Sequence, residues 1–535
     1  MSQKQKMYLK PNLVPEPLVD NWYAWSHLVS PATASFNMLN RHLKIMDSYI
    51  ESPEVHEMAI KDPRMLGGPF MDFPVTSVEG VKELKANTLS ENAELIGFAE
   101  AVFQMNKMIH EQAKGNTIEP LYQQIPENLR GFVELVYDLN HIPRFRFFES
   151  LLYKSHFYKE SLQSLDMYLT EQDDRPFVLS TPRLTEADNR CQVKIPFRSP
   201  EIDQFFKTQV RPAYIADMID LLQIPAHKHK LFETFFHETP PQPYVKYDGE
   251  GIRTRYFGHA CILAEMKGVT ILTDPVISYY GYKYEVNRFT YSDLPDKIDY
   301  VLITHNHQDH ILMETMLQIR HKIGTIIVPK CNGGSLQDPN LKLMFNMIGF
   351  DNVIEIDEMQ SITKEGCSIT CLPFIGEHAD LDIRSKGCYH VEYGGFRMIF
   401  FADSCNVEPE LYRRIHKIIG DVDVIFLGME CDGAPLSWLY GPLLMQPVKR
   451  SDDYSRRLKG SNYENAIDLV NRFNPTSVYV YAMGQEPWLK YIMSLVYTEK
   501  SNPIIASNQL IKECRERGIY AERLFGEKEI LYENV

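Results

Sequence analysis

The sequence predicts an α/β protein in which a mixed, largely helical N-terminal domain precedes a sandwich of two β-sheets between two layers of helices, an αββα arrangement. Two observations predict it. The hydrophobic period changes from helical to β after a proline cluster at residues 240–243, and strands and helices then alternate to the end of the chain. A chain of 535 residues is also too long for one ordinary core.

The first part, residues 1–243, is mostly helical in pattern. Apolar residues recur every three or four positions in residues 35–48 and 90–114, which predicts amphipathic helices. Residues 177–180 and 193–196 predict short strands. This part contains no cluster of metal-ligating side chains, so we expect an accessory domain that dimerises or docks a partner protein.

Pro240, Pro241 and Pro243 mark the boundary, because proline can neither continue a helix nor enter a central strand. The second part is residues 244–535. Its expected strands are residues 253–257, 261–264, 269–273, 301–304, 325–328, 368–372, 397–401, 424–427 and 478–481. Its expected helices are residues 312–319, 341–347, 409–418 and 463–473.

The histidine-rich stretch has the pattern H-x-H-x-D-H. Side chains alternate in direction along an extended segment, so His305 and His307 can point the same way and hold one metal ion. Asp309 and His310 lie where the chain turns into a helix, and a second ion could bind there beside the first. Imidazole and carboxylate ligands suit Zn, Fe or Mn, so these four residues leave the metal open. The alternative is a polar loop with hydrogen-bonded histidines.

Further ligands are expected at the ends of later strands. Asp403 follows residues 397–401, and the adjacent Glu377 and His378 follow residues 368–372. If that segment is extended, only one of Glu377 and His378 can point at a metal. A histidine ligand favours a zinc-like hydrolase, whereas a glutamate favours a carboxylate-rich pair suited to iron and O2. In the metallo-β-lactamase superfamily, which the histidine-rich loop resembles, hydrolases usually carry a further histidine after the last strand. None follows residues 478–481 here, and the resemblance therefore implies an open position on the second metal unless Glu430 or water fills it.

The H-x-H-x-D-H loop after a buried strand resembles the metallo-β-lactamase superfamily, whose fold is the αββα sandwich. Together with Gly376-Glu377-His378-Ala379-Asp380-Leu381, Phe401-Ala402-Asp403-Ser404 and the large N-terminal part, it resembles the diiron amino-acid β-hydroxylases associated with nonribosomal peptide synthetases. The resemblance implies that residues 244–535 are the catalytic domain. It also implies one iron on His305, His307 and Glu377, a second on Asp309 and His310, and Asp403 bridging the two.

The same resemblance implies an O2-dependent monooxygenase of natural-product biosynthesis. Its substrate would be an amino acid held as a thioester on a synthetase carrier domain and hydroxylated at the β-carbon. The sequence carries no flavin or nicotinamide motif, so an external reductase or ferredoxin would supply electrons. A metal-dependent hydrolase, either a lactonase or a phosphodiesterase, is the alternative. A flavodiiron reductase fits less well, because those enzymes carry glutamate at the place of His307.

Three more positions near the loop have expected roles. In the superfamily an aspartate at the place of Asp274 braces the ligand loop and does not contact the metal. His259 either does the same or is a buried, hydrogen-bonded histidine. Tyr279-Tyr280-Gly281-Tyr282 either lines a substrate channel or packs against the core.

The amino-acid composition indicates in which cellular compartment the protein works and which kinds of partner it can bind. With 56 Lys and Arg against 71 Asp and Glu, the net charge of −15 argues against nucleic-acid binding. Nine cysteines without close metal-type pairs do not suggest a disulfide framework and fit a reducing cytosol. The polar Met1–Lys6 stretch leads into no signal peptide, and no apolar run approaches the ~20 residues that span a bilayer. We expect a cytoplasmic homodimer that associates through residues 1–243.

Overall fold

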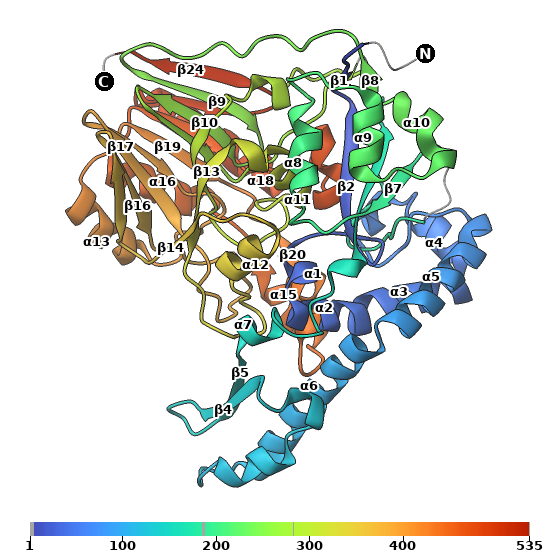
Figure 1. Ribbon diagram of the computed structural model, residues 1–535. Helices are drawn as coiled ribbons and strands as arrows, with labels where there is room; N and C mark the ends of the chain where they lie inside the picture. The colour runs from blue at the N-terminus through green and yellow to red at the C-terminus, as the bar shows by residue number, and fades with distance from the viewer. Residues whose placement is uncertain (1–4, 185–187, 282, 534–535) are drawn as a thin grey trace.

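The computed structural model describes residues 5–184, 188–281 and 283–533 (Figure 1). Most of the polar N-terminal stretch, residues 1–4, therefore lies outside the described residues, as does Tyr282. Within the described ranges, no helix is both long enough and apolar enough to cross a membrane.

Residues from 252 onward form two facing sheets. The strands of the first sheet are β9 (Ile252–Gly258), β10 (Cys261–Met266), β11 (Val269–Thr273), β12 (Ile298–Leu302), β13 (Ile323–Pro329), β14 (Val353–Ile356) and β24 (Lys528–Tyr532). Their spatial order is β14-β13-β12-β11-β10-β9-β24, and β11 to β14 run parallel. The C-terminal strand β24 pairs antiparallel with β9, so it closes one edge of this sheet.

The second sheet repeats this plan. Its strands are β15 (Ser361–Lys364), β16 (Cys367–Leu372), β17 (Cys388–Tyr393), β18 (Phe396–Phe400), β19 (Val424–Gly428), β22 (Ser477–Tyr481) and β23 (Tyr520–Arg523), which are also neighbours in this order. Successive strands from β15 to β18 are antiparallel, and β18, β19, β22 and β23 are parallel.

Apolar side chains fill the space between the two sheets. Ile271, Leu302 and Ile327 of the first sheet belong to one buried cluster with Phe400 and Phe426 of the second. The outer face of the second sheet is covered by the helices α13 (Pro409–Ile419), α16 (Tyr463–Phe473) and α18 (Asn502–Glu516). The αββα sandwich is therefore confirmed.

The N-terminal half supplies much of the layer over the first sheet. The N-terminal half is built around a four-stranded sheet. Its strands are β2 (Leu13–Val19), β3 (Trp22–Tyr23), β6 (Gln163–Leu169) and β7 (Cys191–Lys194), and their spatial order is β3-β2-β6-β7. Its larger helices are α2 (Pro31–Asn37), α3 (Leu43–Glu51), α5 (Val78–Glu91), α6 (Ala93–Gln112), α8 (Pro200–Lys207) and α9 (Ile215–Leu222). In Figure 1, α6 and the hairpin of β4 (Val133–Tyr137) and β5 (Pro143–Phe147) extend away from the sandwich. A mixed, largely helical N-terminal domain is confirmed.

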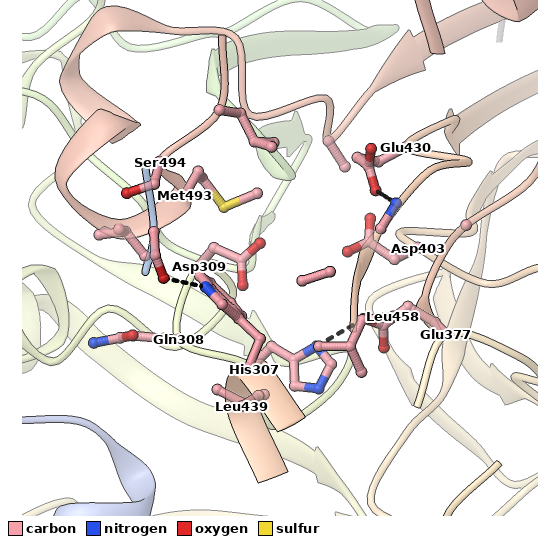
Figure 2. A pocket seen from close by; sticks show the side chains of 18 of the residues that line it. His307, Gln308, Asp309, Glu377, Asp403, Glu430, Leu439, Leu458, Met493 and Ser494 are labelled. Carbon is pink, nitrogen blue, oxygen red and sulfur yellow. Dashed lines mark hydrogen bonds and ion pairs between the residues drawn. The ribbon is translucent and has the colours of Figure 1, made fainter. Parts of the chain in front are cut away.

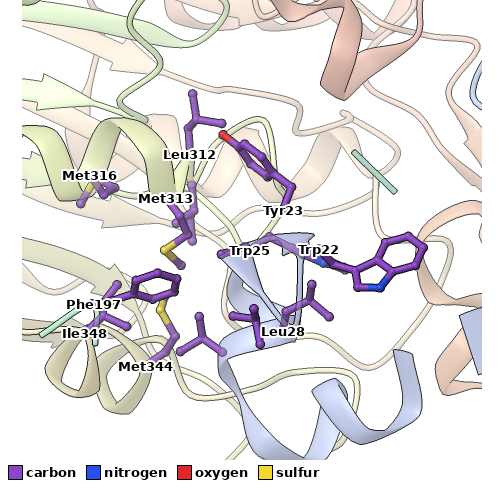
Figure 3. Close-up of a cluster of buried hydrophobic side chains, with 14 of the residues drawn as sticks. Trp22, Tyr23, Trp25, Leu28, Phe197, Leu312, Met313, Met316, Met344 and Ile348 are labelled. Carbon is purple, nitrogen blue, oxygen red and sulfur yellow. The ribbon is translucent and has the colours of Figure 1, made fainter. Parts of the chain in front are cut away.

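One continuous apolar core joins the two halves (Figure 3). Trp25 and Leu28 of the N-terminal half lie in the same buried cluster as Met313 of α11 (Met313–Ile319) and Met344 of α12 (Leu341–Met347). Val301 of β12 belongs to this cluster as well. Burying one such side chain contributes roughly 1.5–3 kcal/mol to the free energy of unfolding. Separating the two halves would expose these side chains, so it would remove a large part of the protein's stability.

A buried cluster of ion pairs also joins the halves. The Arg175 guanidinium lies 2.6 Å from a carboxylate oxygen of Glu16 on β2 and 2.6 Å from one of Glu314 on α11. The Tyr23 hydroxyl donates to Glu314 at 3.0 Å. Burial alone would raise the pKa of Glu16, but the surrounding arginines hold this pKa well below its ordinary value. Because α11 directly follows the histidine-rich loop, this cluster fixes that loop against the N-terminal half.

Three expected strands differ from the structure. The strand expected at residues 193–196 lies two residues earlier, as β7 (Cys191–Lys194). Residues 177–180 form a turn, in which the Thr181 amide donates to the Phe177 carbonyl at 3.0 Å. Val178 and Leu179 are buried, so the apolar run reflects core packing and not a strand. The strand expected at residues 301–304 ends at Leu302, because the chain there begins to turn toward the histidine-rich loop.

Candidate metal centre

The candidate site lies at one edge of the sandwich, where strands from both sheets end. Asp274 directly follows β11, and the histidine-rich loop joins β12 to α11. Glu377 follows β16, Asp403 follows β18 and Ala482 directly follows β22. Since β11 and β12 are parallel, and β16 and β18 each pair antiparallel with β17, these strand ends meet at the same edge.

The structure brings all six expected ligand residues together in two groups of potential ligands. The first group contains His305, His307, Glu377 and His378, and the second contains His259, Asp309, His310 and Asp403. Within each group the potential ligand atoms lie within 4.8 Å of one another.

Asp403 belongs to the second group and also faces the first. Its Oδ2 is 3.0 Å from His310 Nε2 in the second group and 3.9 Å from His305 Nε2 in the first. This position fits a carboxylate shared by two metal ions.

Both Glu377 and His378 point into the first group. Glu377 Oε1 lies 2.9 Å from His307 Nδ1, and Glu377 Oε2 lies 2.9 Å from His378 Nδ1. The expectation that only one of them can face a metal depends on an extended segment, and that premise is wrong. Gly376 has φ +80° and Glu377 has φ +63°, so the chain turns here and the strict alternation of an extended strand does not apply.

Left-handed backbone is concentrated around the site. The non-glycine residues with positive φ at these strand ends are His259 (50°), Asp274 (33°), Glu377 (63°), Ala379 (52°), Asp380 (58°), Ala402 (47°) and Ala482 (51°). Each such conformation costs of the order of 1–3 kcal/mol and persists only where its surroundings hold it. The sharp turns that result bring side chains from separate strands to one point.

Asp274 braces the loop, as the resemblance to the superfamily implies. Its Oδ1 accepts a hydrogen bond from the Thr304 amide at 2.8 Å, and its Oδ2 accepts one from the Thr304 hydroxyl at 2.6 Å. Oδ2 also lies 2.8 Å from His310 Nδ1. An aspartate partner keeps the His310 proton on Nδ1, which leaves the Nε2 lone pair free to bind a metal.

Two further contacts surround the groups. His259 Nε2 lies 2.9 Å from Asp309 Oδ2 and 3.2 Å from His310 Nε2, so His259 belongs to the second group itself. His307 Nε2 lies 2.8 Å from the hydroxyl of Tyr440 on α14 (Leu436–Tyr440). A single tyrosine on a short helix has no spacing signal, and so Tyr440 was not predicted.

The donor set fits metal ions. Burial lowers the pKa of His305, and the neighbouring histidines lower it further, so this ring is neutral. Burial would raise the pKa of Glu377, yet His307 and His378 hold it well below its ordinary value, and the carboxylate is ionised. Five buried atoms of the two groups have no hydrogen-bond partner among the described residues: His259 Nδ1, His305 Nε2, Glu377 Oε2, His378 Nε2 and Asp403 Oδ1. Cations between these groups would satisfy them, and the imidazole and carboxylate ligands suit iron.

A cavity of about 250 Å³ opens onto both groups (Figure 2). Its walls include His307, Asp309, Glu377 and Asp403, with Ala482 at the place where superfamily hydrolases are expected to carry a further histidine. The remaining lining is largely apolar and includes Leu66, Trp438, Leu439, Leu458, Ile492, Met493 and Leu495.

Glu430 also lines this cavity and belongs to neither ligand group. Its carboxylate accepts hydrogen bonds from the Gly433 amide at 2.5 Å and the Tyr497 hydroxyl at 3.0 Å. Burial raises the pKa of Glu430 to about 7. By contrast, Tyr279 does not line the cavity and donates to Glu314, which favours packing for that residue.

Comparisons with known proteins agree with this geometry. Residues 8–240 match the N-terminal domain of the diiron non-haem β-hydroxylases, and residues 269–447 match a β-lactamase superfamily domain. The chain is 38% identical over 521 residues to the 4-amino-L-phenylalanyl-[CmlP-peptidyl-carrier-protein] 3-hydroxylase of Streptomyces venezuelae, covering 96% of this chain and 98% of that protein. The chain belongs to the diiron non-haem β-hydroxylase family.

Solved structures of this family extend the match to the whole fold. The crystal structure of CmlA, a diiron β-hydroxylase from Streptomyces venezuelae, superposes with a TM-score of 0.93 at 37% identity and covers 98% of this chain and 99% of that one. A mutant of CmlA gives a TM-score of 0.91 at 36% identity, covering 98% of this chain and 100% of that one. The protein is thus a diiron β-hydroxylase. Its membership of this family excludes the alternative prediction of a lactonase or a phosphodiesterase.

Proposed function

We propose that this enzyme uses O2 to hydroxylate the β-carbon of an amino acid held as a thioester on a carrier domain of a nonribosomal peptide synthetase. The main support is the full-length similarity to a relative whose name specifies an aminoacyl carrier protein as substrate. The cavity that opens onto both ligand groups supports it too, since a tethered substrate must enter from the surface.

For the metal site, we propose that His305, His307 and Glu377 hold one iron, that Asp309 and His310 hold the other, and that Asp403 bridges them. The separation into two groups, with Asp403 Oδ2 between His310 and His305, supports this assignment. A diiron pair, when bound, supplies the O2 activation needed to hydroxylate an unactivated carbon.

The protein's own residues prepare the site for that chemistry. Asp274 holds the His310 proton on Nδ1, and the Tyr440 hydroxyl binds the ring nitrogen of His307 that faces away from Glu377. Leu439, Leu458 and the other apolar walls limit the water that reaches the reacting carbon.

We further propose the organisation and partners of the enzyme. Residues 244–535 serve as the catalytic domain, and residues 1–243 serve to dock the carrier or to form a homodimer. Leu139 is 99% exposed at the β4–β5 turn, which offers an apolar contact for a second copy. A monomer in light scattering would contradict the homodimer. An external reductase or ferredoxin delivers electrons, and nine unpaired cysteines support a reducing cytoplasmic location.

The test is turnover on carrier-bound substrates. Purified enzyme, a reductant and O2 are incubated with carrier proteins loaded with a panel of amino acids, and the products are analysed by mass spectrometry after thioester cleavage. A β-hydroxylated amino acid is expected from the loaded carrier and not from the same amino acid free in solution. Hydroxylation of the free amino acid alone, or of none of the panel, would contradict the proposal.

A further inference from the structure

The cavity wall carries one carboxylate that the ligand groups do not use. Asp309, Glu377 and Asp403 each belong to a ligand group, whereas Glu430 does not. In Figure 2, Glu430 lies beside Asp403 at the same side of the cavity. A substrate carbon placed at the two groups would therefore have Glu430 close by.

Glu430 has no cationic partner among the residues that the structure describes. None of the described residues that line the cavity is lysine or arginine, and Glu430 is in none of the ion pairs found among the described residues. A carboxylate that is shielded from water is normally paired with a cation. An unpaired one at a cavity wall beside a catalytic centre points to a cation supplied by the ligand.

Two donors hold this carboxylate in place. The Gly433 amide donates to Oε2 and the Tyr497 hydroxyl donates to Oε1. Each carboxylate oxygen has a further lone pair, so both can still accept from an incoming group. The backbone of Glu430 is held as well, because the Gly460 amide donates to the Glu430 carbonyl at 2.7 Å. Glu430 is thus a preorganised acceptor.

We propose that Glu430 binds the α-ammonium group of the carrier-bound amino acid and so selects α-amino acyl groups and orients their β-carbon. This inference rests on the proposed function. Every aminoacyl thioester carries its ammonium on the carbon next to the β-carbon, which places the two atoms about 2.5 Å apart by standard bond lengths and angles. When the β-carbon reaches the ligand groups, the ammonium must lie beside them, where Glu430 is.

The test compares two substrates on one carrier: an α-aminoacyl group and the same acyl group without the amine. Glu430→Gln keeps the size and removes the charge. Wild-type enzyme is expected to prefer the amino substrate in kcat/KM, and Glu430→Gln is expected to reduce that preference roughly 10- to 100-fold by slowing the amino substrate alone. Glu430→Asp, which keeps the charge, is expected to retain part of the preference. Glu464→Gln, at an exposed position of α16, is the matched control.

The outcomes separate the inference from the proposed function. If Glu430→Gln retains the wild-type preference, or slows both substrates equally, the inference is overturned while the proposed function stands. Loss of one iron in Glu430→Gln would make Glu430 a metal ligand and would also overturn it. A wild-type enzyme that hydroxylates neither carrier-bound substrate would overturn the proposed function itself. If Glu430→Gln does not fold, Tyr497→Phe provides the second variant, and an unchanged preference there would contradict the inference.

Discussion

Replacing Asp274 by asparagine changes one atom of the contact network behind the second ligand group. The new carboxamide can still accept from the Thr304 amide through Oδ1. Its NH2 group would face the Thr304 hydroxyl, which can rotate to accept, and His310 Nδ1, which lies 2.8 Å away. His310 Nδ1 would then have to accept, and its proton would move to Nε2, the atom that faces Asp403.

The magnitude follows from this change of tautomer. To bind iron, His310 must keep its proton on Nδ1, where it would now oppose another donor. Leaving a buried donor without an acceptor costs about 1–3 kcal/mol, or roughly 5- to 150-fold in an equilibrium constant. Losses of 10- to 100-fold in metal affinity are typical when a partner of a ligating histidine is changed. We therefore expect Asp274→Asn to weaken the binding of the iron that His310 holds by about 10- to 100-fold.

The assay is competition for iron with a chelator of known affinity, with Asp351→Asn at an exposed surface position as the control. Urea unfolding of the metal-free proteins shows separately whether the variant is simply less stable. An iron affinity of Asp274→Asn within twofold of wild type would refute the tautomer argument.

Three other predictions follow from the site and the buried cluster. Glu377→Ala is expected to lose iron or to uncouple O2 consumption from hydroxylation, whereas His378→Ala is expected to keep two irons; coupled turnover in Glu377→Ala would contradict the ligand assignment. Arg175→Met leaves the buried Glu314 without a cationic partner among the described residues, whereas Glu16 keeps Arg183 and Arg190. The variant is expected to lower the free energy of unfolding by about 3–5 kcal/mol in urea titrations, and a loss below 1 kcal/mol would contradict the anchoring role. The pKa of Glu16 in the folded protein lies well below its ordinary value of 4.5, so Glu16 contributes stability above pH 4.5 that is lost as the pH falls through the folded-state pKa. Glu16→Gln should make the unfolding free energy of the metal-free protein fall less steeply below pH 4.5, and an unchanged slope would contradict this.

The sequence predicts a helix or a strand well where the spacing of apolar residues fits only one of the two. Residues 463–473 are apolar on one face, and α16 has those bounds. The sequence does not predict β24, because apolar and polar residues alternate only weakly there and the residues are half exposed. The strand forms because it pairs antiparallel with β9 at the edge of the first sheet. The composition of residues 177–180 predicts a strand, whereas the structure has a turn. A short apolar run in a sheet and one in a buried turn have the same composition, so the sequence alone does not distinguish them.

For the site, the spacing of the histidine-rich loop and the resemblance were enough to name six residues that the structure brings together. The roles of His259 and His378 could not be predicted in this way. Both side chains reach the groups through left-handed turns, at His259 itself and at Gly376 and Glu377, and no sequence pattern fixes φ at a non-glycine residue. Tyr440 reaches His307 from a helix 133 positions further along the chain, so only the tertiary fold places it there.

The most direct measurement of the central claim is the metal content of protein purified without chelator or added metal, together with its Mössbauer spectrum. The account predicts two irons per chain whose spectrum is that of a spin-coupled pair, and loss of that signal in Asp403→Ala. Zinc in place of iron, or two irons that are not coupled, would contradict a diiron centre bridged by Asp403.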